Sequence, residues 1–222
     1  DSSTSRGLGD VYKRQFTSLG GNQFVDSPVL GQWSTWLSTD LKSEVKQRYA
    51  TNGRFGLVGK SSGGYGGLVN AMLAPECWDG VACHSGDVGF ELMFKPTFAE
   101  TLTHVARYGS AAAYVDHVRN AAKLSGPDFH SLMICAMAAS YDPRAPTESN
   151  PLGVVLPVDS TTARLDETAW AKWLAFDPLT MIESGSNNLQ NLAALWIDCG
   201  NKDQYHIPVS YTHLTLPTKR IV

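Results

Sequence analysis

Residues 57–67, LVGKSSGGYGG, contain side chains whose types and spacing could carry out chemistry. The run from Gly59 to Gly63 fits the pattern G-x-S-x-G, in which a serine sits on a sharp turn between a strand and a helix. Such a turn exposes the Ser61 hydroxyl at the carboxyl edge of a sheet, and it leaves the Ser62 N–H free to stabilise an oxyanion. The pattern predicts Ser61 as a nucleophile; the alternative is a glycine-rich turn in which the serine is only structural.

The same run also contains Gly-Lys-Ser, the ending of a nucleotide-binding loop. That loop requires a glycine five positions before Gly59, where this chain has Arg54. Its glycines must precede the lysine so that backbone N–H groups can surround phosphates, whereas here they follow Lys60. We therefore reject nucleotide binding at this turn.

Short apolar runs and helical patterns alternate around the turn. Buried strands are predicted at 54–59, 80–85 and 192–199, and helices at 33–49 and 62–73. Strands that alternate with helices indicate an α/β fold with a parallel sheet.

About a hundred residues of different character separate the second and third of these strands. They contain helical stretches near 98–124, 128–140 and 167–175 and a loop rich in proline and aspartate at 141–166. An insertion of this size is more often a cap over a site than a linker. We expect residues about 90–185 to form a mostly helical cap that adds apolar side chains to an acyl pocket.

Composition excludes several classes of protein. The 222 residues are 43% hydrophobic and 18% charged, which is typical of a globular chain, and no apolar stretch is long enough to span a membrane. With 18 basic and 21 acidic residues the net charge is −3, which argues against a nucleic-acid partner. No cluster has the spacing of metal ligands, so neither a metal nor a cofactor is predicted. The cysteines are widely spaced and are read as free thiols: Cys77, Cys83, Cys135 and Cys199.

The two ends do not follow the pattern of the interior. Residues 1–15 and 209–222 contain GLGDVYKRQ and SYTHLTLPTKRIV, which resemble translated sequencing-adapter strings. Segments of this kind carry no information about the native fold. We expect a hydrolase domain at 16–208, flanked by two non-native segments, in a gene that continues beyond each break.

The interior resembles a known family. GKSSGGYG at the turn, LGGNQFVDSP at 19–28, HSGD at 84–87 and WIDCGNKDQY at 196–205 are similar to motifs of the putative-esterase family. This branch of the α/β-hydrolases includes esterase D, feruloyl esterases and mycobacterial mycolyltransferases. The resemblance implies an α/β-hydrolase fold, here incomplete, and a Ser–Asp–His triad in that chain order.

The resemblance assigns Ser61 as the nucleophile and Asp203 as the acid, and it places Gly20 and Gly21 in a loop that lines the substrate pocket. From the residues alone, the loop after the third strand offers both Asp198 and Asp203. We favour Asp203, because it can turn back toward the nucleophile, whereas Asp198 lies within the apolar run.

The third triad member is not found. The resemblance places the histidine a few dozen residues beyond the acid, after one more strand, and neither His206 nor His213 matches that position. The other histidines are read as local or packing residues: His84, His104, His117 and His130. The strand whose loop carries the second oxyanion donor is expected upstream of residue 16.

These observations predict a serine carboxylesterase that acts on a small-molecule ester and lacks its own histidine. Two alternatives stay open. One is an acyltransferase on the same fold, in which an alcohol replaces water, and the other is a non-catalytic α/β-hydrolase-like binding protein.

Overall fold

The computed structural model describes residues 17–184 and 188–215. Their contacts divide the chain into two compact units. One unit comprises residues 23–26, 32–95 and 171 onward, and the other comprises 17–22, 27–31 and 96–170. All three strands of the parallel sheet belong to the first of these units.

The sheet confirms the predicted fold class and strands. It contains β3 (Gly56–Lys60), β4 (Gly80–His84) and β5 (Ala194–Asp198), all parallel and in the order β3-β4-β5. The last residues of the three strands are register partners, so the strands end at the same edge. Each strand lies within two residues of its predicted range.

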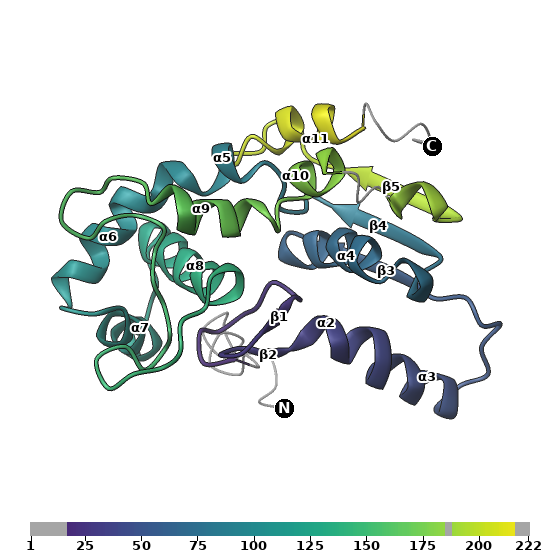
Figure 1. The fold of residues 1–222 in the computed structure, drawn as a ribbon, viewed down its shortest axis with the longest axis horizontal. Helices are drawn as coiled ribbons and strands as arrows, with labels where there is room; N and C mark the ends of the chain where they lie inside the picture. The colour runs from purple at the N-terminus through teal and green to yellow at the C-terminus, as the bar shows by residue number, and fades with distance from the viewer. Residues whose placement is uncertain (1–16, 185–187, 216–222) are drawn as a thin grey trace, which may run out of the picture. The chain divides into compact units, whose positions relative to one another are not determined.

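Helix α4 (Ser62–Leu73), predicted at 62–73, packs on one face of the sheet (Figure 1). A Cβ on Gly67 would lie 3.5 Å from the side chains of Leu57 and Val81, so the helix backbone lies directly on the strands. On the opposite face Val58 is 78% exposed and Trp196 is 48% exposed. The described sheet therefore buries one face and leaves apolar side chains exposed on the other.

The first unit contains several further helices. The predicted helix 33–49 is formed by α2 (Trp33–Trp36), a π-helical turn η1 (Leu37–Leu41) and α3 (Lys42–Arg48). Short elements not predicted from the sequence are η2 (Pro75–Cys77), α5 (Phe90–Met93), α10 (Pro178–Glu183) and η4 (Asn188–Asn191). A short hairpin, β1 (Asp26–Ser27) and β2 (Gly31–Gln32), precedes α2.

The inserted region is mainly helical, as predicted. After η3 (Lys95–Thr97) it contains α6 (Phe98–Arg107), α7 (Ala111–Asn120), α8 (Gly126–Tyr141) and α9 (Glu167–Leu174). The predicted stretch 98–124 is two helices, because Gly109 has a φ of +79° and the Ser110 side chain caps α7 by accepting from the Ala113 N–H. The role of this region as a cap stays a prediction. None of the helices in the described ranges is long and apolar enough to cross a membrane.

The structure differs from expectation at the C-terminal end. Residues 207–215 form α11 (Ile207–Thr215), so part of the C-terminal segment that resembles adapter sequence is folded. Ile207, Tyr211 and Leu214 are buried, and their spacing of four and three places them on one face of the helix. The foreign origin of this segment stays a prediction, and residues 1–15 and 216–222 lie outside the described residues.

Tyr211 connects α11 to the sheet. Its hydroxyl accepts from the Gly86 N–H at 2.6 Å and lies 3.2 Å from Cys83 Sγ, in a buried environment. The hydroxyl therefore satisfies a backbone donor just beyond the end of β4.

We expect Tyr211→Phe to lower the free energy of unfolding by about 1–3 kcal/mol, because the buried Gly86 N–H loses its acceptor. Urea unfolding followed by circular dichroism measures the change. His213→Ala is the matched control, since His213 is an exposed residue of the same helix. Equal stability of Tyr211→Phe and the control would show that α11 is not docked as described.

Candidate active site

Ser61 occupies the turn between β3 and α4 with an unusual backbone. Its φ is +54° and its ψ is −130°, a conformation that costs a non-glycine residue about 1–3 kcal/mol. The Ser61 N–H donates to the His84 carbonyl at 2.9 Å, and the Ser61 carbonyl accepts from the Tyr65 N–H at 3.0 Å. The turn is thus held by the neighbouring strand on one side and by the first turn of α4 on the other, and Ser61 itself is exposed.

Glycines make this turn possible by removing side chains where strand and helix meet. A Cβ on Gly59 would lie 2.2 Å from the backbone carbonyl group of Gly63. A Cβ on Gly64 would lie 3.1 Å from both Cys83 Sγ and the Gly59 carbonyl oxygen. The helix can begin directly after the strand only because these positions carry no side chain.

Ser62 is the first residue of α4, so its N–H has no acceptor within the helix. Its hydroxyl lies between two buried groups. Gln23 Nε2 donates to Ser62 Oγ at 3.1 Å, and Ser62 Oγ donates to Asp87 Oδ2 at 3.3 Å. Sequence reasoning did not assign roles to Gln23 or Asp87, although both lie in the motifs LGGNQFVDSP and HSGD.

Asp87 is a buried acid next to the turn. Burial raises the pKa of its carboxyl from 3.8 to about 7; the hydrogen bond from Ser62 lowers this pKa, and the charge of Asp203 raises it. Asp203, in the loop after β5, is therefore close enough to Asp87 for the two charges to interact. Asp203 is half-buried, and its Oδ1 accepts from the Tyr205 N–H at 2.8 Å.

The alternative acid, Asp198, ends β5 and is exposed. Its Oδ2 accepts from Trp196 Nε1 at 2.7 Å, and its Oδ1 lies 2.8 Å from His84 Nδ1. These two hydrogen bonds hold the pKa of Asp198 below its usual value, and the bond from Trp196 has the larger effect. Its carboxylate is therefore already engaged by neighbouring strand residues.

Gly20 and Gly21 belong to the other compact unit, and their role as pocket residues stays a prediction. The Gly21 carbonyl accepts from Thr17 Oγ1 at 2.7 Å, and the Gly20 N–H donates to the Thr17 carbonyl at 3.2 Å. These bonds form a tight turn, in which Gly20 has a φ of +87°.

No histidine in residues 17–184 or 188–215 hydrogen-bonds to Ser61 or Asp203, and all six histidines of the chain fall in these ranges. His104 bonds to Ser131, and His206 has a φ of +60°, with its carbonyl accepting from residues of the first turn of α11. Within the described ranges, no imidazole therefore hydrogen-bonds to Ser61, Asp87 or Asp203, and the His84 imidazole contacts Asp198 instead.

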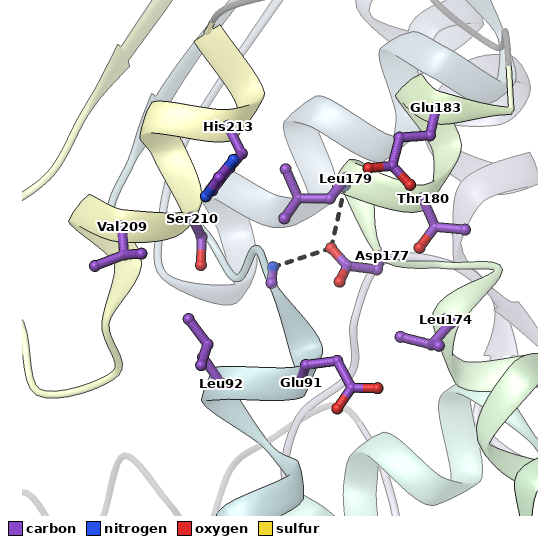
Figure 2. Close-up of a pocket in the computed structure, with 11 residues that line it drawn as sticks. Glu91, Leu92, Leu174, Asp177, Leu179, Thr180, Glu183, Val209, Ser210 and His213 are labelled. Atoms are coloured by element: carbon purple, nitrogen blue, oxygen red, sulfur yellow. Dashed lines mark hydrogen bonds between the residues drawn. The ribbon is translucent and has the colours of Figure 1, made fainter.

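A cavity of about 240 Å³ lies among α5, α10 and α11 and is lined by none of the predicted site residues (Figure 2). Asp177 points into this region, and its carboxylate accepts from the N–H groups of Gly89, Phe90 and Leu179 at 2.8–3.2 Å. The Asp177 carboxylate therefore caps the N-terminal ends of α5 and α10, and its role is structural.

Comparison with known proteins identifies the family. A family model described as Putative esterase matches residues 25–221, nearly the whole of the described chain. No curated protein matches the sequence. The parallel sheet, the helices that flank it and this match together show an incomplete α/β-hydrolase fold.

We expect Gly59→Ala to destabilise the protein by roughly 3 kcal/mol or more, because the new methyl group would overlap backbone atoms of Gly63 that cannot move without breaking the turn. Gly63→Ala is the matched control. A Cβ at Gly63 would meet nothing within 4 Å, so alanine should stabilise α4 by about 0.5–1 kcal/mol. Thermal unfolding of both variants checks the pair, and a harmless Gly59→Ala would contradict the close contact.

The raised pKa of Asp87 predicts a specific pH dependence of stability. The folded protein binds this proton more tightly than the unfolded chain, so the contribution is complete below pH 3.8 and is lost as the pH rises through about 7. Asp87→Asn removes this loss, and we expect the variant to be more stable than the parent at pH 8 by a few kcal/mol, with about 4 as the upper limit.

Urea unfolding at pH 5 and pH 8 measures this difference. Asp40→Asn, at an exposed position of η1, is the control and should follow the parent at both pH values. If Asp87→Asn and the parent lost stability equally between the two pH values, Asp87 would not be the buried acid described.

Proposed function

Because the chain belongs to the putative-esterase family, we propose that it is a serine carboxylesterase in which Ser61 is the nucleophile. The observation that carries the proposal is the backbone of Ser61, which is strained, exposed and placed directly between a strand and a helix. Such strain persists only where the surrounding structure enforces it, and it is concentrated at functional sites. A purely structural serine does not require this conformation.

The chemistry follows from the groups around the turn. The Ser61 hydroxyl oxygen adds to the ester carbonyl carbon, its proton passes to a base, and the negative charge on the carbonyl oxygen is stabilised by the Ser62 N–H. The tetrahedral intermediate then collapses, and the alcohol leaves with a proton from the base. Water adds to the acyl-serine in the same way and releases the carboxylic acid.

Asp203 is proposed as the acid that orients the base. Its place in the loop after β5 and its electrostatic effect on Asp87 support this role. Asp198 is less suitable, since Trp196 and His84 already occupy its oxygens.

We propose that none of the six histidines serves as this base. Removing the base from a serine triad costs about 10⁴-fold or more in turnover. The 222-residue chain should therefore react at Ser61 but turn over slowly.

The test combines labelling and turnover. A fluorophosphonate should modify the protein slowly at Ser61, as located by peptide mass spectrometry, and hydrolysis of a short-chain nitrophenyl ester should be weak. Both signals should disappear in Ser61→Ala, because the attacking oxygen is gone. Ser43→Ala, on the exposed side of α3, is the matched control and should behave as the parent.

Two results would contradict the proposal. Labelling or hydrolysis that survives Ser61→Ala would remove Ser61 as the nucleophile. Rapid Ser61-dependent turnover that is lost in His206→Ala or His213→Ala would show that one of these histidines is the base.

A further inference from the structure

The hydroxyl of Ser62 is enclosed by groups from two distant segments of the chain. Gln23 Nε2 and Asp87 Oδ2 lie 3.1 and 3.3 Å from Ser62 Oγ. Gln23 and Asp87 are both almost completely buried, and their other oxygens, Gln23 Oε1 and Asp87 Oδ1, have no hydrogen-bond partner among the described residues. Three polar side chains are thus brought together beside the nucleophile, and the catalytic scheme above does not use their hydroxyl, amide or carboxyl groups.

Counting donors and acceptors distinguishes two states of this cluster. A serine hydroxyl has one proton and two lone pairs, and the amide of Gln23 uses one lone pair. If Asp87 is ionised, it can only accept, so the Ser62 proton is committed to Asp87. If Asp87 is neutral, its own proton can point at the second lone pair of Ser62 Oγ. The Ser62 proton is then free.

We propose that Asp87 is a positioning residue that controls the direction of the Ser62 hydroxyl, and that neutral Asp87 frees this hydroxyl to donate to the oxyanion formed at Ser61. Ser62 would then supply two donors to the oxyanion, its backbone N–H and its side chain. This inference rests on the proposed function of Ser61, and it adds a second oxyanion donor from within the described chain.

The surroundings of Asp87 favour the neutral form. Three acids interact electrostatically with Asp87: Asp203 and Tyr205 from the loop after β5, and Cys83 from β4. Gln23 and Ser62 are uncharged. Burial is the largest cause that raises the pKa of Asp87, to about 7, so both states are populated near neutral pH. An ionised Asp87 would also repel the negative charge that develops on the substrate oxygen.

The experiment measures the rate of fluorophosphonate labelling at Ser61 from pH 6 to pH 8. In Asp87→Asn the amide Nδ2 can donate to Ser62 Oγ at every pH, as the neutral acid does. We expect the ratio of the Asp87→Asn rate to the parent rate to be close to one at pH 6 and about ten at pH 8, one pH unit above the pKa. Asp40→Asn, which changes an exposed acid of η1 outside the cluster, should give a constant ratio.

Ser62→Ala provides a second test that leaves Asp87 in place. The variant should be slower than the parent at pH 6, where the hydroxyl is free, and should approach the parent at pH 8, where the hydroxyl is committed to Asp87. A constant ratio for both Asp87→Asn and Ser62→Ala would overturn the inference.

A third measurement does not depend on reactivity. Carbon-13 NMR of labelled aspartate follows the Asp87 carboxyl directly, and Asp87→Asn identifies its signal. The carboxyl should titrate near pH 7, and Ser62→Ala should raise this pKa because the hydroxyl no longer stabilises the ionised form. Titration below pH 5, or no shift in Ser62→Ala, would also overturn the inference. Failure of the proposed function would give another result. Labelling would then survive Ser61→Ala, and this result does not depend on the pH at which Asp87 titrates.

Discussion

The structure depends on the direct contact between the end of β3 and the first turn of α4. The chain reverses at one residue, Ser61, and helix backbone then lies on strand backbone with no side chain between them. This arrangement requires the bare Cα atoms of Gly59 and Gly64, and it places the exposed Ser61 directly before the first N–H groups of α4, which have no acceptor within the helix. The same constraint therefore sets both the packing of the unit and the geometry of the candidate site.

The same close packing, which leaves no room for a side chain, recurs in the loop after β4, and α11 contacts this loop. A Cβ on Gly86 would lie 2.5 Å from Cys83 Sγ and 2.6 Å from the Tyr65 nitrogen, so the loop after β4 also packs without a side chain. The Gly86 N–H is satisfied by the Tyr211 hydroxyl. Asp87 follows directly and is carried into the interior beside Ser62. The close packing of Gly86 against Cys83 and α4 thus precedes an acid that is 1% exposed.

Much of this arrangement could be predicted from the sequence because it is local. The strands, α4 and the turn at Ser61 follow from short apolar runs next to small residues. Gln23 and Asp87 could not be assigned, since their effect on Ser62 depends on segments 39 and 25 residues away in the chain. The helix at 207–215 was missed for a different reason: the likeness of SYTHLTLPTKRIV to adapter sequence took precedence over the buried spacing of Ile207, Tyr211 and Leu214.

Burial distinguishes Asp87 from Asp203, two acids whose charges interact. Asp203 is half-buried, so its side chain stays accessible to solvent. Asp87 is almost completely buried, and burial raises the pKa of its carboxyl to about 7, so its proton is retained to an unusually high pH. A neutral Asp87 can therefore donate a hydrogen bond at a pH where an ordinary carboxyl group would be an anion. An oxyanion site benefits from this difference, because a neutral carboxyl next to it does not oppose the charge that the site must stabilise.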